Sequence, residues 1–151
     1  MNRSTAREIA VHFVFELAFS NETARQLLDR ELTPEGFARR AQDEPMYAEF
    51  PGQGERDYIT RLVLGAGSHG AELDGYIEMY AKGWRFSRID RVAAAIMRTT
   101  MYEIMYMPDI PNGAAINEAV EIAKGYLDDE VVKFINGILG SFVRSEVPEL
   151  E

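Results

Sequence analysis

Two neighbouring stretches near the end of the chain decide the fold: AINEAVEIAK at residues 115–124 and KFINGIL at residues 133–139. In the first stretch the acidic residues Glu118 and Glu121 alternate with apolar residues that recur every three or four positions, namely Ile116, Ala119, Val120 and Ala123. This spacing predicts a helix with one buried and one hydrated side. Asp128, followed by two further acidic residues, is a natural N-cap for a last helix over about 129–145.

Helical spacing continues through the rest of the chain, and no stretch alternates as a strand does. We therefore expect an all-α protein of about seven helices. They are predicted over about 5–19, 23–32, 34–44, 58–81, 88–106, 114–126 and 129–145. The fourth helix is expected to bend near residues 65–70, and residues 82–84 are expected to form a hinge. This hinge would divide a single domain, 1–151, into an N-terminal helical subdomain over about 1–82 and a C-terminal one over about 83–151.

Gly137 lies inside the second of the quoted stretches. A glycine in a helix interior costs about 1 kcal/mol relative to alanine. We therefore expect another helix to approach closely at this position, where a larger residue would not fit.

Composition excludes several classes of protein. The chain has no cysteine, which excludes disulfide scaffolds, cysteine zinc sites and thiol nucleophiles. It has no apolar run long enough to span a membrane, and its first residues lack the apolar core of a signal peptide. We therefore expect a cytoplasmic protein with no membrane partner.

Catalytic motifs are also missing from the sequence. Glu118 and Glu121 have the spacing of a helical metal site but no histidine follows them. Ser68 and His69 are adjacent without a triad pattern, and the glycines at 65 and 67 lack the lysine of a phosphate loop. We expect no enzyme, and no metal or cofactor.

The first predicted helix is apolar on two sides. One stripe contains Phe13 and Leu17, and a second, at i, i+4 and i+8, contains Val11, Phe15 and Phe19. A helix of this kind is fully buried or has two partners. The second stripe is therefore either a docking surface for another protein or packs against the chain's own long loop.

Basic residues are concentrated in one segment of an acidic chain. The formal net charge of −9 opposes sequence-blind nucleic-acid binding. Residues 82–98 nevertheless contain five basic residues and one acidic residue, and Arg88 and Arg91 are one helical turn apart. Such charges usually form a solvated face. They would form an electropositive strip if the fold placed them beside Arg3 and Arg7.

Three ordered motifs resemble the NusB family: RTTMYEI at 98–104 and the two stretches quoted above. Trp84 upstream and AREIAV at 6–11 are also similar to that family. The resemblance implies two small helical bundles packed across each other. It also implies a transcription antitermination factor that binds boxA-type single-stranded RNA as a heterodimer with NusE, a small-subunit ribosomal protein. With other Nus factors, this assembly would join transcribing RNA polymerase and support ribosomal RNA transcription. The alternative is a protein-interaction module or homodimer of the same fold with weak or no RNA binding.

The resemblance also implies where RNA would bind. Arg3 and Arg7 match a basic N-terminal run that is thin here, because Ser4 and Thr5 stand where further basic residues often occur. A second surface surrounds the start of the last helix. There, aromatic rings would stack on bases, a carboxylate would accept from a base amino group and a lysine would meet a phosphate. The matching residues are Tyr126, Glu130, Lys133 and Phe134, although Phe134 is equally compatible with the core.

Overall fold

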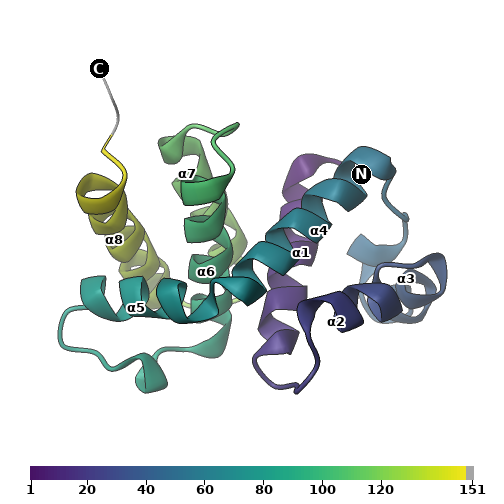
Figure 1. Cartoon of the computed structure of the whole chain (residues 1–151), viewed down its shortest axis with the longest axis horizontal. Coiled ribbons are helices and arrows are strands. Elements are labelled where there is room, and N and C mark those ends of the chain that lie inside the picture. The colour runs from purple at the N-terminus through teal and green to yellow at the C-terminus, as the bar shows by residue number, and fades with distance from the viewer. Residues whose placement is uncertain (149–151) are drawn as a thin grey trace. The chain divides into compact units, whose positions relative to one another are not determined.

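The computed structural model describes residues 1–148, and the regular structure within this range is entirely helical (Figure 1). It comprises α1 (Arg3–Leu17), α2 (Ala24–Glu31), α3 (Pro34–Ala41), α4 (Gln53–Ser68), α5 (Gly70–Tyr80), α6 (Arg91–Tyr106), α7 (Asn112–Lys124) and α8 (Asp129–Glu146), with 3-10 turns η1 (Pro45–Tyr47) and η2 (Phe86–Arg88). The expected all-α fold is confirmed. None of these helices combines the length and hydropathy required to cross a membrane.

The helix expected over residues 58–81 is two helices in the structure. His69 interrupts it with φ −103° and ψ 17°, outside the α-helical region, so that α4 ends at Ser68 and α5 begins at Gly70. The glycine-rich stretch around it was expected to bend, and instead it ends one helix and starts another. This break accounts for the eight α-helices found within residues 1–148, where seven were expected.

The chain forms two compact units, Met1–Ser68 and His69–Glu151. The division falls earlier than the hinge expected at residues 82–84. The physical reason is the packing of α5, which buries Leu73 and Ile77 and contacts α6 and α8. The residues of α5 therefore belong to the second unit.

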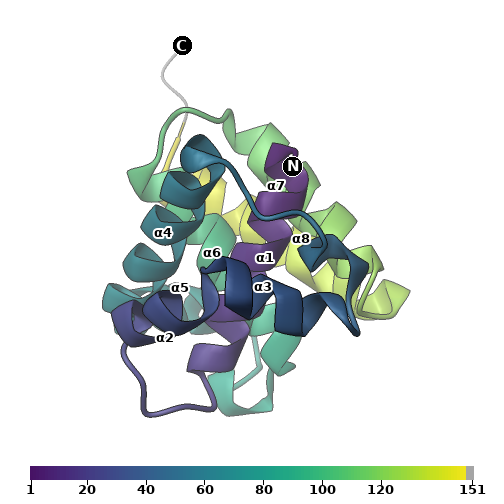
Figure 2. The ribbon, with the colours of Figure 1, turned by 90° about the vertical axis from the view of Figure 1, so that its right-hand side faces the viewer.

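In the first unit, α1 packs against α4 and α2, and α2 packs against α3 (Figures 1 and 2). Large apolar side chains with almost no exposure fill this core, among them Phe13, Leu27, Phe37, Ile59 and Leu62. The expected opening of the third helix is confirmed: Pro34 is its first residue, and the side chain of Thr33 accepts a hydrogen bond from Gly36 N at 2.9 Å.

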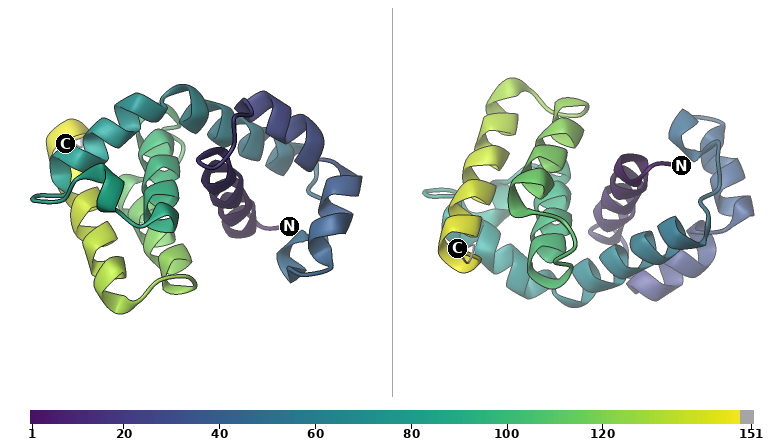
Figure 3. Two further views of the ribbon diagram at one scale, coloured as in Figure 1. Left: turned by 90° about the horizontal axis from the view of Figure 1, so that it is seen from below. Right: turned by 90° about the horizontal axis from the view of Figure 1, so that it is seen from above.

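In the second unit, α6, α7 and α8 lie side by side, and α5 contacts α6 and α8 (Figure 3). Ile135, Leu139 and Phe142 of α8 are buried, as are Ala119 and Ala123 of α7. The predicted N-cap of the last helix is confirmed, because Asp128 Oδ1 accepts a hydrogen bond from Val131 N at 3.0 Å.

The prediction that another helix approaches closely at Gly137 is wrong. A Cβ atom built on Gly137 would meet nothing within 4 Å, and the residue is exposed on α8. Packing therefore does not require glycine at this position.

Candidate nucleic-acid interface

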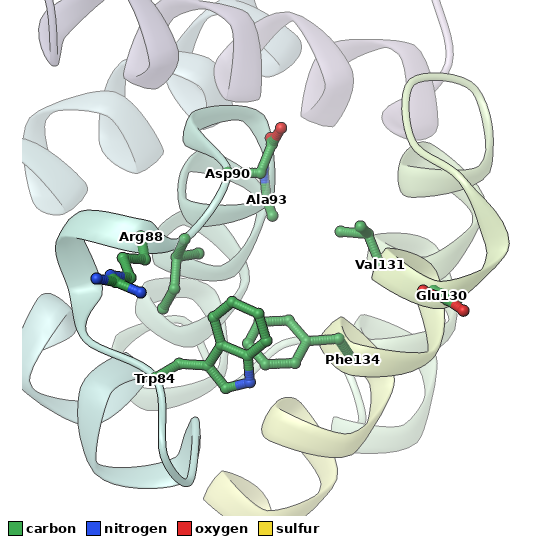
Figure 4. Close-up of a pocket in the computed structure, with 8 residues that line it drawn as sticks. Trp84, Arg88, Asp90, Ala93, Glu130, Val131 and Phe134 are labelled. Carbon is green, nitrogen blue, oxygen red and sulfur yellow. The ribbon is translucent and has the colours of Figure 1, made fainter.

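The second unit contains a pocket of about 280 Å³ beside two aromatic rings (Figure 4). The rings of Trp84 and Phe134 meet edge to face, with centroids 5.9 Å apart and planes at 66°. Trp84 is 53% exposed, which is unusual for so large an apolar side chain. The complete lining consists of Trp84, Arg88, Ile89, Asp90, Ala93, Glu130, Val131 and Phe134.

Two helix starts position the walls of this pocket. Asp90 caps α6, since its Oδ1 accepts hydrogen bonds from Val92 N at 2.8 Å and Ala93 N at 3.0 Å. This cap fixes the end of the loop that carries Trp84 and Arg88. Asp128 caps α8 in the same way and so fixes the first turns, which carry Glu130 and Phe134. Short-range capping therefore sets both sides of a site whose parts are distant in sequence.

Three of the expected RNA-binding residues come together at this pocket: Arg88, Glu130 and Phe134. Phe134 is half-buried, so its ring both packs against Trp84 and borders open space. Lys133 is its neighbour on α8 and is exposed. Tyr126 is exposed in the turn before α8, where its backbone N–H donates to Ala123 O at 3.0 Å.

Arg91 and the remaining basic residues of the 82–98 segment differ in their surroundings. Arg91 is exposed at the first position of α6, and Lys82 and Arg85 are exposed before it. Arg98, in contrast, forms an ion pair with Asp74 of α5, with Nη2 and Oδ2 2.9 Å apart, and lies 5.1 Å from the ring centroid of Phe86. Arg98 is therefore a packing residue, and the positive charge of the segment comes from its first part.

The N-terminal arginines, in the first unit, are both engaged with their own bundle. Arg3 is exposed, with its Nε 2.9 Å from Glu55 Oε2 and its guanidinium 3.9 Å from the ring centroid of Tyr58. Arg7 is only 4% exposed, and its guanidinium lies 5.6 Å from the same ring. The burial of Arg7 argues against a direct RNA contact by its side chain. The sequence places it one turn after Arg3 but does not reveal that burial.

The expected docking stripe on α1 is reduced to two residues. Val11 is 3% exposed and belongs to the core, so it presents no surface to a partner. Phe15 is half-buried and Phe19 is 62% exposed, with ring centroids 4.9 Å apart. These two rings form an apolar patch at the end of α1.

Both histidines contact aromatic side chains of their own unit. His12 Nδ1 is 3.1 Å from the hydroxyl oxygen of the buried Tyr47, and burial lowers the pKa of the His12 imidazole. His69 packs against the rings of Tyr102 and Tyr106, at centroid distances of 5.6 and 4.5 Å. Within residues 1–148, no three histidine, aspartate or glutamate side chains gather in a way that would hold a metal ion.

Trp84 is the site residue that reasoning from sequence missed. It was assigned only to a hinge and to the family resemblance. The available signal was that the single tryptophan of the chain lies between Gly83 and Arg85, in a predicted polar loop that does not favour burial of so large an apolar side chain.

Fold and surface together define a small all-helical protein with an open aromatic pocket bordered by charged side chains. The chain belongs to the NusB family, whose model matches residues 4–144, and the resemblance noted in the sequence is thereby confirmed. The transcription antitermination protein NusB of Acetivibrio thermocellus is 36% identical over 144 residues, which cover 95% of this chain and 90% of that protein. The protein of the same name from Symbiobacterium thermophilum is 39% identical over 148 residues, covering 95% and 90%.

Solved structures show the same fold. NusB of T. maritima superposes with a TM-score of 0.73 at 25% sequence identity, covering 98% of this chain and 94% of that one. A chain from a structure of the antitermination factors NusB and NusE in complex with dsRNA superposes with a TM-score of 0.76 at 21% identity, covering 95% and 96%. At this identity the second comparison establishes the fold alone.

Proposed function

We propose that this chain is a transcription antitermination factor that binds boxA-type single-stranded RNA as a heterodimer with NusE. In this role it supports ribosomal RNA transcription within an RNA polymerase complex that contains other Nus factors. Two observations support the proposal: relatives over nearly the whole chain are transcription antitermination proteins, and a structure of the same fold contains NusB and NusE in complex with dsRNA.

The aromatic pocket at the start of α8 is the observation that carries the RNA-binding part of the proposal. Proteins read single-stranded RNA by stacking unpaired bases on rings and by hydrogen bonding to their edges. Trp84 and Tyr126 are exposed rings in the second unit, and Glu130 and Lys133 are exposed polar groups on the first turns of α8. This combination of rings, an acceptor and a cation is what such reading requires.

Charge limits how the RNA is held. The net charge of −9 disfavours contact with arbitrary phosphates, so the proposed cations are few: Arg3, Arg88, Arg91 and Lys133. Each phosphate contact on a single strand changes the logarithm of the binding constant by about −0.7 per decade of salt, so four contacts give a slope of at most about −3. We therefore expect RNA binding that depends weakly on salt concentration and that is selective for RNA sequence.

Binding to a boxA-type RNA, with and without NusE and at two salt concentrations, tests the proposal. We expect NusE to strengthen binding, and Tyr126→Ala to weaken it about tenfold, as the loss of one stacked base does. Met79→Ala is the matched control, because Met79 is an exposed apolar side chain on α5, outside the proposed surface. Absence of RNA binding with and without NusE would refute the proposal.

The ion pairing and burial of the two N-terminal arginines favour a second function. Arg3 is paired with Glu55 and Arg7 is buried, while Phe15 and Phe19 form an apolar patch. These features suit a protein-interaction module or a homodimer whose RNA contact has been lost. Sedimentation that shows a homodimer of the chain, or a complex with NusE, would support this second function over the first if RNA titrations of the same samples show no binding.

A further inference from the structure

We propose that an aromatic face of the second unit docks an arginine-bearing segment of a partner protein. Side chains of α5, α6 and α8 form this face, and we call it the tyrosine face. Its members are Glu72, Tyr76 and Tyr80 of α5, Tyr102 and Tyr106 of α6, and Glu146 of α8. None of them belongs to the surfaces proposed for RNA or for NusE, so the inference goes beyond the proposed function.

Helical spacing places the three α5 members on one side of that helix. Glu72, Tyr76 and Tyr80 recur every four residues, as residues on one helix face do. Figure 1 shows α5 lying across α6 and α8, which both contact it. Met79, one turn after Tyr76, is 61% exposed and borders the face with an apolar side chain. Tyrosine and methionine are both enriched where proteins dock on one another.

Neighbouring rings hold the tyrosine rings in place. Tyr76 and Tyr80 both meet the buried ring of Phe142 edge to face, at centroid distances of 5.2 and 6.3 Å. The rings of Tyr102 and Tyr106 have centroids 5.0 Å apart and planes at 31°. All four tyrosines are half-buried, so each is anchored by packing and still presents part of its ring to solvent. Rings fixed in this way lose little conformational entropy when a partner docks.

A tyrosine hydroxyl bonds each of the two carboxylates of the face. The Tyr106 hydroxyl donates to Glu72 Oε1 at 2.7 Å, and the Tyr80 hydroxyl donates to Glu146. His69 Nδ1 lies 3.8 Å from Glu72 Oε1. Within residues 1–148, no lysine or arginine forms an ion pair with Glu72 or Glu146. Both carboxylates are exposed, and each keeps lone pairs for a further donor.

Charge and ring chemistry together define the side chain that would dock. The helix α5 contains three acidic residues and no basic one. It would therefore repel a nucleic acid and attract a cationic protein segment. Arginine is the cation that both stacks on an aromatic ring and bonds a carboxylate through two parallel N–H groups. A tyrosine ring beside a carboxylate therefore suits arginine better than lysine.

The two pairs of ring and carboxylate set the spacing of the arginines. Glu72 marks one pair, and Tyr80, bonded to Glu146, marks the other. Their positions on α5 are separated by about 12 Å, at a rise of about 1.5 Å per residue. An extended chain advances about 3.3 Å per residue, and its i and i+4 side chains point the same way. An extended segment with arginines at i and i+4 therefore reaches both pairs.

Amide chemical shifts of the isotopically labelled full chain test the inference. The probe is a short synthetic peptide with arginines at i and i+4 among glycines and serines. We expect this peptide to shift the amides of α5 and of residues 102–106. Glu72→Gln and Glu146→Gln should each weaken its binding by up to about fivefold, as the loss of one exposed ion pair does.

Glu78→Gln is the matched control. Glu78 is an exposed carboxylate of the same helix, but it lies two residues from Tyr76 and from Tyr80 and so points to the opposite side of α5. This variant removes the same charge and should leave the affinity for the peptide unchanged. Far-UV circular dichroism checks that each variant is folded.

Variants of the peptide test the identity of the cation. Citrulline in place of both arginines keeps their shape and removes their charge, so it should abolish the shifts. Lysine in place of both should weaken binding severalfold, because lysine lacks the planar group that stacks on a ring and pairs with both carboxylate oxygens.

The outcomes decide whether the tyrosine face has this occupant. Peptide binding that persists in the complex with NusE and depends on Glu72 and Glu146 would support the inference. Equal losses in Glu78→Gln, or equal affinity for the arginine and lysine peptides, would overturn it by showing a general attraction of cations to an acidic chain. Shifts of the tyrosine face on addition of boxA-type RNA would overturn it in favour of a nucleic acid. Displacement of the peptide by NusE would overturn a separate partner and assign the face to NusE.

Discussion

Replacing Glu31 by glutamine should destabilise the first unit, because this carboxylate belongs to an ion-pair network that joins three helices. Glu31 ends α2 and is buried. It accepts hydrogen bonds from two arginines of α3, Arg40 Nε at 2.8 Å and Arg39 Nη2 at 2.7 Å. Arg40 also donates to Glu16 of α1, at 2.7 and 2.8 Å from the two carboxylate oxygens. The arrangement therefore ties α1, α2 and α3 together.

The expected magnitude follows from how exposed each arginine is. The side chain of Arg39 is 57% exposed, so its pair contributes little. The side chain of Arg40 is only 15% exposed, and a hydrogen bond between charged groups in such a setting is worth about 1.5–3 kcal/mol. Glutamine keeps the shape and one acceptor oxygen of Glu31. We therefore expect Glu31→Gln to lower the free energy of unfolding by about 2 kcal/mol.

The effect should depend on pH. Burial acts to raise the pKa of the Glu31 carboxyl, but the hydrogen bond and charge of Arg40 outweigh it, and the pKa in the folded protein lies below the ordinary value of 4.5. The stabilisation is therefore fully present above the pKa of the unfolded chain and is lost as pH falls through the lower folded pKa. The difference between wild type and Glu31→Gln should shrink in that acidic range.

Urea unfolding of the full chain, followed by far-UV circular dichroism at neutral and acidic pH, measures both effects. Glu22→Gln is the matched control, because Glu22 pairs with Arg30 at 2.6 Å but the Arg30 side chain is 51% exposed. The control should lose less than about 1 kcal/mol. Equal losses in the two variants at neutral pH would refute the assignment of Glu31 as the stabilising centre.

Three other substitutions test separate features of the account. Gly137→Ala should raise the free energy of unfolding in urea by about 0.5–1 kcal/mol, since nothing in the structure opposes a Cβ there; a loss would show that the position is crowded. Asp128→Ala should lower it by about 1 kcal/mol and speed amide hydrogen exchange in the first turn of α8, and unchanged exchange would contradict the capping role. Phe15→Ala should weaken NusE binding, measured by calorimetry, with little loss of fold; unfolding of this variant would show that Phe15 is a core residue.

Local signals in the sequence predicted much of the fold. The caps at Thr33 and Asp128 depend on residues within one turn, so the residue types alone indicate them. The break at His69 was harder to predict, because no proline marks it and the surrounding glycines are compatible with a bend. The division between the units was misplaced because the burial of Leu73 and Ile77 on α5 depends on helices much later in the chain.

The candidate site was only partly predictable because burial and ion pairing are long-range properties. Helical spacing grouped Val11 with Phe15 and Phe19, yet the packing around α1 buries only Val11 among them. Counting charges over residues 82–98 included Arg98, whose partner Asp74 lies outside that window. Glu130 and Phe134 were identified from one helix and a family resemblance, whereas Trp84 became a site residue only when the fold placed its ring against Phe134.

If RNA binds around the start of α8, amide and indole chemical shifts of the isotopically labelled chain will locate the contact. On addition of boxA-type RNA to the complex with NusE, we expect the largest shifts at the Trp84 indole N–H and in residues 126–134. RNA-induced shifts confined to Met1–Ser68, with the Trp84 indole and α8 unchanged, would contradict it.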